Sequence, residues 1–428
     1  MKIAIIGSGI AGNVAAFRLA RHHDITVFEA ERRIGGHTNT VKVDHRGSSL
    51  AIDTGFIVFN DVTYPNFIAL LDELGVASQK SDMSFSVRCE RTGLEYNGAN
   101  LNTLFAQRRN LLRPSFHRML RDILRFNREA PSLLATPNSP LTLDAYLAAN
   151  DYSREFVEHY IIPMGAAIWS ASPQGMGSVP AGFFVRFFHN HGLLSISDRP
   201  TWRVIKGGSA RYTERLVAGH RNRIRLGSPV QSLVRHADHV EVKTPGNEPE
   251  SFDCAFVACH SDQALALLAD PSQQEREVLG AIPYQENEAV LHTDTSLMPR
   301  NRRAWAAWNY HVPARPEQRS GHVALTYNMN ILQSLPCSEQ FCVTLNHTHA
   351  IDPGSVIESF AYSHPIFSHG AVAAQARHRE INGVRRTYFC GAYWGYGFHE
   401  DGVVSALKAL NHMNRDLVGE SGPSALAA

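Results

Sequence analysis

The chain opens with a pattern of apolar strand, glycine turn, apolar helix and second strand. Lys2–Ile6 is an apolar run rich in β-branched residues, which is typical of a buried strand. The segment Ile10–His22 then predicts a helix, and Ile25–Glu29 predicts a second strand. Two short strands joined through a helix indicate a βαβ unit, which implies a parallel sheet covered by helices.

Other stretches predict further elements of a mixed α/β fold. Residues 64–75 have the spacing of an amphipathic helix that ends at Gly75, and residues 100–135 are helical and basic in character. His239–Lys243 alternates like a half-exposed strand, and Phe252–Ala258 is apolar enough for a buried one.

Composition narrows the class of protein. The chain has 428 residues, 44% of them hydrophobic, which predicts a large core divided over two or three domains. The net charge of +1 argues against a nucleic-acid partner, because phosphate contacts require a basic excess. Six cysteines without a C-x-x-C pair indicate a reducing compartment. With no run of about 20 apolar residues, we expect a cytoplasmic location, or a peripheral one at the inner membrane surface.

The turn after the first strand has the spacing G-x-G-x-x-G. Gly7 permits the tight turn, Gly9 leaves space for a pyrophosphate, and Gly12 allows close packing of helix and strand, with Ser8 and Ala11 between them. The helix N-terminus offers N–H groups to the anion. Glu29, at the end of the second strand, is placed to accept the hydroxyls of an adenosine ribose, so the pattern predicts a dinucleotide site.

The residues after Glu29 match the extension E-x-x-x-R-x-G-G-R-x-T. The chain therefore resembles the superfamily of flavin-containing amine oxidases and phytoene desaturases. Residues 163–172 and 291–311 resemble a bacterial subgroup of predicted NAD/FAD-binding proteins. The resemblance implies an FAD cofactor and a contact between this loop and its diphosphate. The residues it assigns to the cofactor here are Ala30, Arg33, Gly35, Gly36, His37 and Thr38. One departure is His37, which stands where the family has Arg, so the fixed positive charge is lost.

A second stretch of the chain, Arg386–Ala406, resembles the family's C-terminal flavin motif. The resemblance places Gly402 and Val403 at a helix N-terminus facing the pyrimidine end of the flavin, with Asp401 as the cap. Shorter similarities extend the predicted cofactor site to the D-x-G segment, to the strand near adenine and to the glycine that ends an apolar strand. Those residues are Thr54, Gly55, Phe56, Val230 and Gly391.

We therefore expect an α/β fold with a Rossmann-like FAD-binding domain and an α+β substrate-binding domain, similar to amine oxidases. Both domains are predicted to be discontinuous. The FAD-binding domain is expected from residues 1–80, 201–275 and 376–420, the substrate domain from 81–200 and 276–375, and a flexible tail from 421–428.

The expected function is an FAD-dependent oxidoreductase that oxidises a C–H bond by hydride transfer to flavin N5. The apolar stretches around residues 163–170 and 183–188 favour a lipid or fatty-acyl substrate. The bacterial subgroup, associated with lipid-modifying methyltransferases, points the same way. An amine substrate and a non-redox isomerase remain alternatives. Candidate substrate-side residues are His399, which stands where a cage tyrosine is usual in amine oxidases, Tyr396 and Trp169.

Two other features carry weaker hypotheses. Residues 107–129 hold seven arginines, with Phe116, Leu120, Ile123 and Leu124 expected on an apolar face. Such a helix can contact an anionic membrane or an acyl carrier, or be merely solvated. The pairs His189/His191 and His347/His349 lack partners at ligand spacing, so we predict no metal. The sequence also lacks a nucleophile elbow and a P-loop, which leaves hydrolase and NTPase functions without support.

Overall fold

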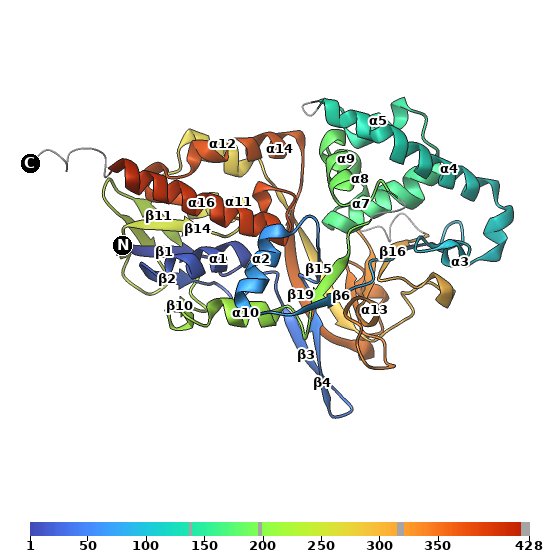
Figure 1. The fold of residues 1–428 in the computed structure, drawn as a ribbon, viewed down its shortest axis with the longest axis horizontal. Helices are drawn as coiled ribbons and strands as arrows, with labels where there is room; N and C mark the ends of the chain where they lie inside the picture. Colours follow the sequence, from blue (N-terminus) through green and yellow to red (C-terminus); the bar gives the residue numbers. More distant parts are fainter. Residues whose placement is uncertain (137–138, 196–198, 315–320, 421–428) are drawn as a thin grey trace, which may run out of the picture.

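The predicted N-terminal βαβ unit is present in the computed structural model, which describes residues 1–136, 139–195, 199–314 and 321–420 (Figure 1). Strand β1 (Lys2–Ile6), helix α1 (Ile10–Leu19) and strand β2 (Asp24–Phe28) follow one another, and β1 pairs with β2 in parallel. The helix ends at Leu19 rather than His22, because the N–H groups of His22 and His23 both turn back to the Leu19 carbonyl.

A five-stranded parallel sheet gathers strands from three distant parts of the chain. Its order is β10-β2-β1-β14-β20, so β1 lies at the centre. The added strands are β10 (Ile224–Arg225), β14 (Cys254–Val257) and β20 (Thr387–Phe389). The apolar run expected as one strand over Phe252–Ala258 is divided, because Asp253 leaves it to accept a hydrogen bond from the Lys2 N–H at 2.7 Å.

Alternate residues of β1 pack on opposite faces of this sheet, which explains why the strand is apolar throughout. Ile3 and Ile5 face a core formed with helices, whereas Ala4 and Ile6 face a second core. The first core holds α1, α2 (Pro65–Leu74), α10 (Ala210–Val217) and α16 (His399–Glu420). The second holds the antiparallel sheet β11 (Ser232–Arg235), β12 (Val240–Lys243) and β13 (Glu250–Phe252), and helices α11 (Ser261–Leu267), α12 (Gln273–Gly280) and α14 (His369–Ala376).

A seven-stranded sheet forms the second part of the molecule. Its neighbouring strands are antiparallel except for the parallel pair β16 and β7. In order, the strands are β19 (Val356–Pro365), β15 (Tyr284–His292), β18 (Cys342–Leu345), β17 (Leu325–Asn328), β16 (Trp308–Val312), β7 (Phe85–Cys89) and β8 (Leu94–Asn97).

Helical segments from the first half of the chain accompany this sheet, and all of them except residues 108–112 share one large core with it. In chain order, these helical segments are α3 (Leu101–Leu104), η1 (Arg108–Leu112), α4 (Pro114–Glu129), η2 (Ala130–Ala135), α5 (Leu143–Ala149), α6 (Arg154–Phe156), the π-helical turn η3 (Val157–Ile161), α7 (Ile162–Trp169), α8 (Pro173–Gly177) and α9 (Ala181–Asn190).

Smaller elements connect the two parts. The hairpin β3 (Thr40–His45) and β4 (Ser48–Asp53) projects from the junction, and β5 (Val58–Asn60), β9 (Trp202–Ile205) and β6 (Ser78–Lys80) form a short sheet there (Figure 1). The remaining short helical segments are η4 (Arg221–Arg223), η5 (Arg302–Ala304), α13 (Met329–Gln333), η7 (Thr348–Ala350), η8 (Pro353–Ser355), α15 (His378–Ile381), η9 (Val384–Arg386) and η10 (Ala392–Trp394).

The predicted division of the chain can be compared with the sheets. The parallel sheet draws its strands from the three segments expected for cofactor binding, and the seven-stranded sheet from the two expected for substrate. The exact boundaries stay a prediction, and the expected tail 421–428 lies outside the described residues. Across the part of the chain that the structure describes, no helix combines the length and apolar character needed to cross a bilayer.

Candidate flavin site

The three glycines of the first turn have different surroundings. Gly7 adopts a φ of +101°, a backbone conformation that residues other than glycine rarely adopt. A Cβ at Gly12 would overlap the Gly7 carbonyl oxygen, so helix α1 can lie this close to β1 only with glycine there. A Cβ at Gly9 would meet nothing within 4 Å, so this residue faces open space. The turn is therefore tightly packed at Gly7 and Gly12, and it has room for a ligand at Gly9.

The N-terminus of α1 is suited to an anion. Its N-cap, Gly9, is extended, no side chain caps it, and no acidic residue lies in its first turn. The N–H groups of this turn and the positive end of the helix dipole therefore face the space above Gly9. These residues fit the diphosphate of a dinucleotide.

Glu29 is buried directly after β2, with 7% of its surface exposed. One carboxylate oxygen accepts hydrogen bonds from the Ser8 N–H at 2.8 Å and the Ser8 hydroxyl at 2.6 Å, and the other accepts the Glu31 N–H. Val230 follows Ser228 by two residues, and the Ser228 N–H donates to the Glu29 carbonyl. Val230 therefore lies near the end of β2. The carboxylate thus links the glycine turn to the strand end, where the sequence places the ribose.

The loop after Glu29 folds over the glycine turn. Gly35 and Gly36 both adopt positive φ, and a Cβ on Gly36 would lie 3.2 Å from the Gly9 Cα. Arg33 donates through one guanidinium nitrogen to the carbonyls of Gly36 and Thr38, at 2.7 and 3.2 Å. Arg33 therefore shapes the loop from within, a role that the resemblance did not specify. Ala30 is exposed beside it.

His37 lies in a cluster of rings. Its centroid is 5.1 Å from Tyr362, 5.2 Å from His364 and 6.0 Å from His260. Burial, together with repulsion from the neighbouring histidines, holds the pKa of His37 well below its usual value. The residue that replaces the family's arginine is therefore neutral, and its partners come from distant parts of the chain.

The D-x-G segment locks onto this loop. A Cβ at Gly55 would overlap the His37 carbonyl oxygen, which also accepts the Phe56 N–H at 2.7 Å. The Thr54 hydroxyl lies 3.0 Å from the Tyr362 hydroxyl. Asp53 accepts hydrogen bonds from the Ser209 N–H and hydroxyl, both at 2.8 Å, and burial raises its pKa to about 6.

The C-terminal motif differs in detail from the prediction. Helix α16 begins at His399, so Asp401 lies inside its first turn, and its carboxylate reaches back to accept the N–H groups of Tyr396 and Phe398. Burial raises the pKa of Asp401 to about 7. The Gly402 N–H already donates to the Phe398 carbonyl, so Gly402 does not offer a free N–H to the flavin as expected.

Gly402 instead permits contact between the two ends of the chain. A Cβ there would lie 2.6 Å from the Ile10 side chain, so α16 can approach the start of α1 only with glycine at this position. Val403 is buried in the same core. Gly391 donates its N–H to the Ser405 hydroxyl at 2.9 Å, which joins the end of β20 to α16. The front and back motifs therefore meet at one place.

The three substrate-side candidates separate into two groups. Trp169 and Tyr396 are brought together: the indole N–H donates to the Tyr396 carbonyl at 3.1 Å. His399 instead stacks on Phe56, with ring centroids 3.4 Å apart, and its Nε2 lies within 3.0 Å of the Thr38 and Tyr212 hydroxyls. Burial lowers the pKa of His399 to about 3. That His399 faces substrate stays a prediction, and the structure shows its ring within this buried network.

Several site residues lay beyond the sequence analysis. Tyr212, Tyr362, His260 and His364 were not among the predicted site residues, and sheet pairing and helix packing bring them to the site. Asp53 is the first residue of the D-x-G segment, and its contact with Ser209 joins this segment to the turn before α10.

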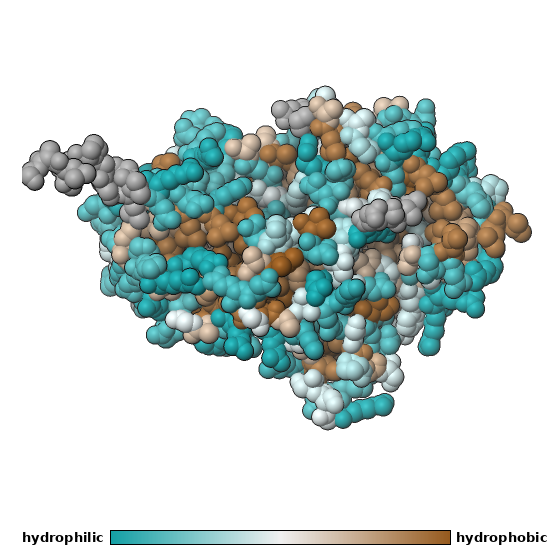
Figure 2. All heavy atoms as spheres, viewed as in Figure 1, coloured by the Kyte–Doolittle hydropathy of each residue, from teal (hydrophilic) through white to brown (hydrophobic). Residues whose placement is uncertain are grey.

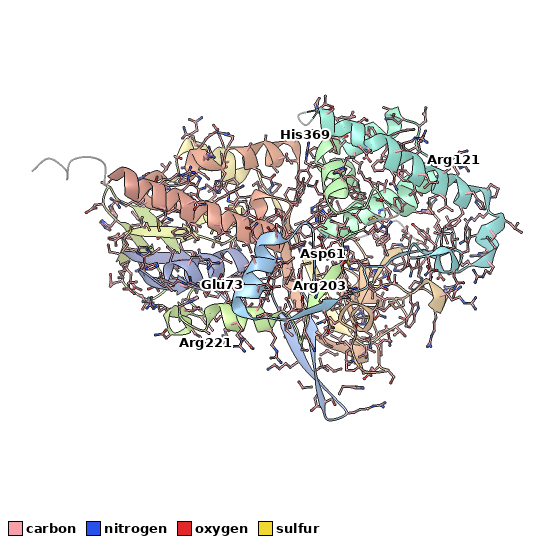
Figure 3. All side chains as sticks on the ribbon, viewed as in Figure 1. Asp61, Glu73, Arg121, Arg203, Arg221 and His369 are labelled. Atoms are coloured by element: carbon pink, nitrogen blue, oxygen red, sulfur yellow. The ribbon has the colours of Figure 1, made fainter. Side chains whose placement is uncertain are left out.

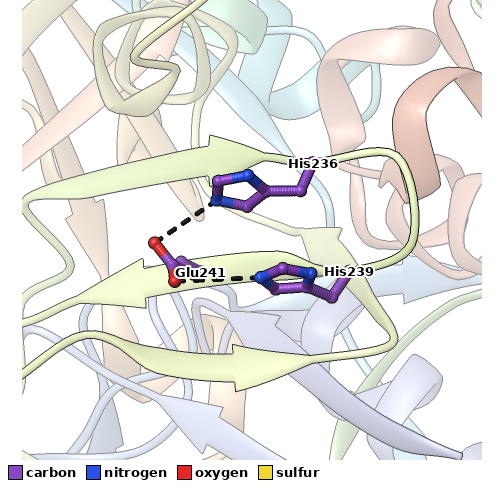
Figure 4. A group of neighbouring side chains, drawn as sticks. All are labelled: His236, His239 and Glu241. Atoms are coloured by element: carbon purple, nitrogen blue, oxygen red, sulfur yellow. Dashed lines mark ion pairs between the residues drawn. The ribbon is translucent and has the colours of Figure 1, made fainter.

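One group among the described residues has metal-ligand geometry, although the sequence analysis did not name it. His236, His239 and Glu241 lie on the β11–β12 hairpin with ligand atoms within 4.8 Å of one another (Figure 4). The two imidazoles stack in parallel at 4.4 Å, and Glu241 lies 3.4 and 3.8 Å from their nitrogens. The pairs His189/His191 and His347/His349, at which no metal was predicted, do not take part in it.

The fold, with its five-stranded parallel sheet joined to a seven-stranded mixed sheet, indicates the class of protein. A family model described as flavin containing amine oxidoreductase matches residues 10–305. The chain belongs to this family, as the motifs at Glu29–Thr38 and Arg386–Ala406 predicted, and the predicted amine-oxidase-like α/β fold class is confirmed.

Solved structures with the same fold include both oxidases and an isomerase. Cyclohexylamine oxidase from Brevibacterium oxydans superposes with a TM-score of 0.70 at 16% identity, covering 97% of this chain and 99% of the other. Putrescine oxidase bound to putrescine gives 0.69 at 14% identity, covering 97% and 100%. A CLA-producing fatty acid isomerase from P. acnes gives 0.68 at 18% identity, covering 96% and 97%. At these identities the likeness concerns the fold alone.

Curated relatives match over short segments. The 4,4'-diapophytoene desaturase of Staphylococcus aureus strain MRSA252 is 38% identical over 63 residues, which are 14% of this chain and 12% of the desaturase. The protein of strain Newman is 47% identical over 45 residues, or 10% and 9% of the two chains. The chain thus matches only a small fraction of each relative's length.

Proposed function

We propose that this chain is an FAD-dependent oxidoreductase that removes hydrogen from a C–H bond of an apolar lipid or fatty-acyl substrate. Its membership of a flavin-containing family supports the cofactor, and the choice of FAD rests on Glu29 and the glycine turn. When bound, a flavin accepts a hydride at N5. The protein's own task is then to hold the cofactor, orient the C–H bond and exclude water.

Three parts of the site would share the dinucleotide. Glu29 would hold the adenosine ribose, because its buried carboxylate can accept hydroxyl protons. The open N-terminus of α1 above Gly9 would hold the diphosphate. The segment from Thr54 to Phe56 and the start of α16 would border the ring, since Phe56 and His399 already stack against each other there.

The observation that carries the substrate class is an aromatic cluster next to α16. Its members come from α7, α9, the segment after β19 and the C-terminal motif, and they are Trp169, Phe183, Phe187, Phe367, Tyr396 and Phe398. Phe183, Tyr396 and Phe398 are only half-buried at the edge of this core. A half-buried aromatic wall beside the flavin motif favours an apolar substrate.

The acidic residues beside this cluster argue against a cationic amine. Asp401 is bound to the N–H groups of Tyr396 and Phe398, and Glu400 to the Phe67 N–H and the Asn66 amide. A protonated amine is recognised by free carboxylates or by a cage of rings. His399, an imidazole, stands where amine oxidases usually have a cage tyrosine, so an amine remains the second candidate.

Anaerobic titration of the FAD-loaded protein tests the proposal. Fatty acids, acyl thioesters and phospholipids dispersed in detergent form one arm, and cyclohexylamine and putrescine form the other. We expect acyl substrates to bleach the visible flavin absorbance, with one double bond appearing per flavin reduced. Bleaching by amines alone would contradict the lipid assignment, and double-bond migration without bleaching would identify an isomerase instead.

A pair of variants locates the substrate. Phe183→Ala removes a half-buried ring of the cluster and should slow reduction by the acyl substrate about tenfold, because roughly 1–2 kcal/mol of apolar contact is lost. Phe17→Ala is the matched control, since Phe17 is also half-buried but lies on α1, where Arg18 and Arg21 pack over its ring. Equal losses in both variants would place the substrate elsewhere.

A further inference from the structure

Exposed leucines gather at one end of the molecule. Leu101 in α3 has 75% of its surface exposed, and Leu111 and Leu112 in η1 have 49% and 89%. Figure 2 shows hydrophobic residues collected at the end of the molecule where Figure 1 labels α3 and α4. A single exposed leucine is ordinary, but three in two consecutive helical segments form a patch that water solvates poorly.

Arginines from two distant segments surround these leucines. Arg108 and Arg109 lie in η1 itself, and Arg300 and Arg303 are exposed in and before η5. The two segments are fastened together because the Asn301 amide donates to the Ala106 carbonyl at 2.7 Å. Glu95 adds to this link by accepting the Arg300 N–H at 2.9 Å. The sequence alone gave no sign that residues near 300 would reinforce the basic segment 107–129.

The outer face of α4 also combines exposed basic residues with an exposed leucine. Its exposed positions are His117, Arg118, Arg121, Leu124 and Arg128, which recur at helical spacing. Figure 3 shows Arg121 directed outward from α4. Leu124 was expected on the apolar face, but it is 55% exposed and lies within the basic stripe. The buried face is formed instead by Phe116, Met119, Asp122 and Phe126.

We propose that α3, η1 and η5 form a docking surface for an anionic lipid bilayer. The exposed leucines would enter the boundary between headgroups and acyl chains, and the surrounding arginines would contact lipid phosphates. An acidic carrier protein would satisfy the arginines, whereas the exposed leucines call for an apolar layer beside the negative charge. The bilayer is favoured because it accommodates both kinds of side chain. This inference does not depend on which substrate the flavin oxidises.

Vesicle cosedimentation of the full-length, FAD-loaded chain tests the surface. Vesicles of phosphatidylglycerol and phosphatidylcholine are compared with vesicles of phosphatidylcholine alone. We expect at least tenfold stronger partitioning onto the anionic vesicles at 50 mM salt, and a large loss at 500 mM salt, because screening weakens the arginine contacts. Absence of binding to anionic vesicles at low salt, or binding of an acidic acyl carrier protein instead, would overturn the proposal.

Paired variants distinguish binding through this surface from nonspecific binding of the protein to vesicles. Leu111→Ser with Leu112→Ser, and Arg300→Gln with Arg303→Gln, should each reduce vesicle partitioning at least tenfold. The controls are Val62→Ser, a 61% exposed residue before α2, and Arg221→Gln, which lies at the opposite side of the molecule from α4 (Figure 3). Flavin content and melting temperature verify folding of every variant. Equal losses in test and control variants would contradict the assignment.

Discussion

At the scale of single residues, the position of Glu29 predicts a role in FAD binding. Its carboxylate is the buried acceptor at the end of β2, and we expect Glu29→Ala to weaken FAD binding by about 1.5–3 kcal/mol, or roughly 10–100-fold in Kd. Titration of the apoprotein with FAD, followed by quenching of flavin fluorescence, measures this. Glu31→Gln is the control because Glu31 is exposed. Unchanged FAD affinity in Glu29→Ala would contradict the ribose assignment.

Individual residues differ in how far the sequence foretold their roles. Glu29 and Gly12 were predictable because their functions depend on spacing within one βαβ unit. The ring cluster around His37 was not, because His260 and His364 come from other elements of the fold. The contacts of His399 were not predictable for a related reason: its partners Thr38 and Tyr212 belong to segments that no local pattern connects to it.

At the scale of elements, the contact between β1 and α1 separates folding from cofactor binding. Gly12→Ala forces a Cβ into the Gly7 carbonyl, so it should lower the free energy of unfolding by about 1–3 kcal/mol even without cofactor. Gly9→Ala meets open space, so the apoprotein should keep its stability but lose FAD affinity. Chemical denaturation of both apoproteins and FAD titration check this. Equal destabilisation by the two changes would be inconsistent with the described turn.

The elements themselves show what pattern alone can predict. β1 and β12 match or nearly match their expected bounds, and α2 ends at Gly75 as expected because that residue adopts a φ of +63°. The helix α16 starts at His399, earlier than the Asp401 cap that was predicted. The family motif matches residue types only, whereas the helix boundary depends on the hydrogen bond from the Phe398 N–H to Asp401. Strand order in the seven-stranded sheet lay outside any sequence argument, because its pairings join distant segments.

At the scale of the whole molecule, buried histidines predict sensitivity to acid. Burial lowers the pKa of six of them to about 4, namely His159, His191, His292, His347, His364 and His378. The unfolded chain binds protons at these groups from about pH 6.5 downward, so the folded state loses stability as the pH falls. The raised pKa values of Asp53 and Asp401 act in the opposite direction, but they are fewer.

The melting temperature should therefore be lower at pH 5 than at pH 7. Each net proton bound on unfolding contributes about 1.4 kcal/mol per pH unit. Thermal unfolding followed by circular dichroism at both values measures the effect. His292→Gln should reduce the pH dependence, whereas His22→Gln, at an exposed residue, should leave it unchanged. A melting temperature that is equal or higher at pH 5 would contradict this account.

The central claim is that the glycine turn at the front of the chain and the helix α16 at its back enclose one flavin dinucleotide. The visible absorption spectrum of the purified protein, combined with extraction and quantification of the released nucleotide, tests this most directly. We predict a yellow protein with one FAD per chain, whose binding is lost in Gly9→Ala. A colourless protein that takes up no added FAD, or equal binding in Gly9→Ala, would contradict it.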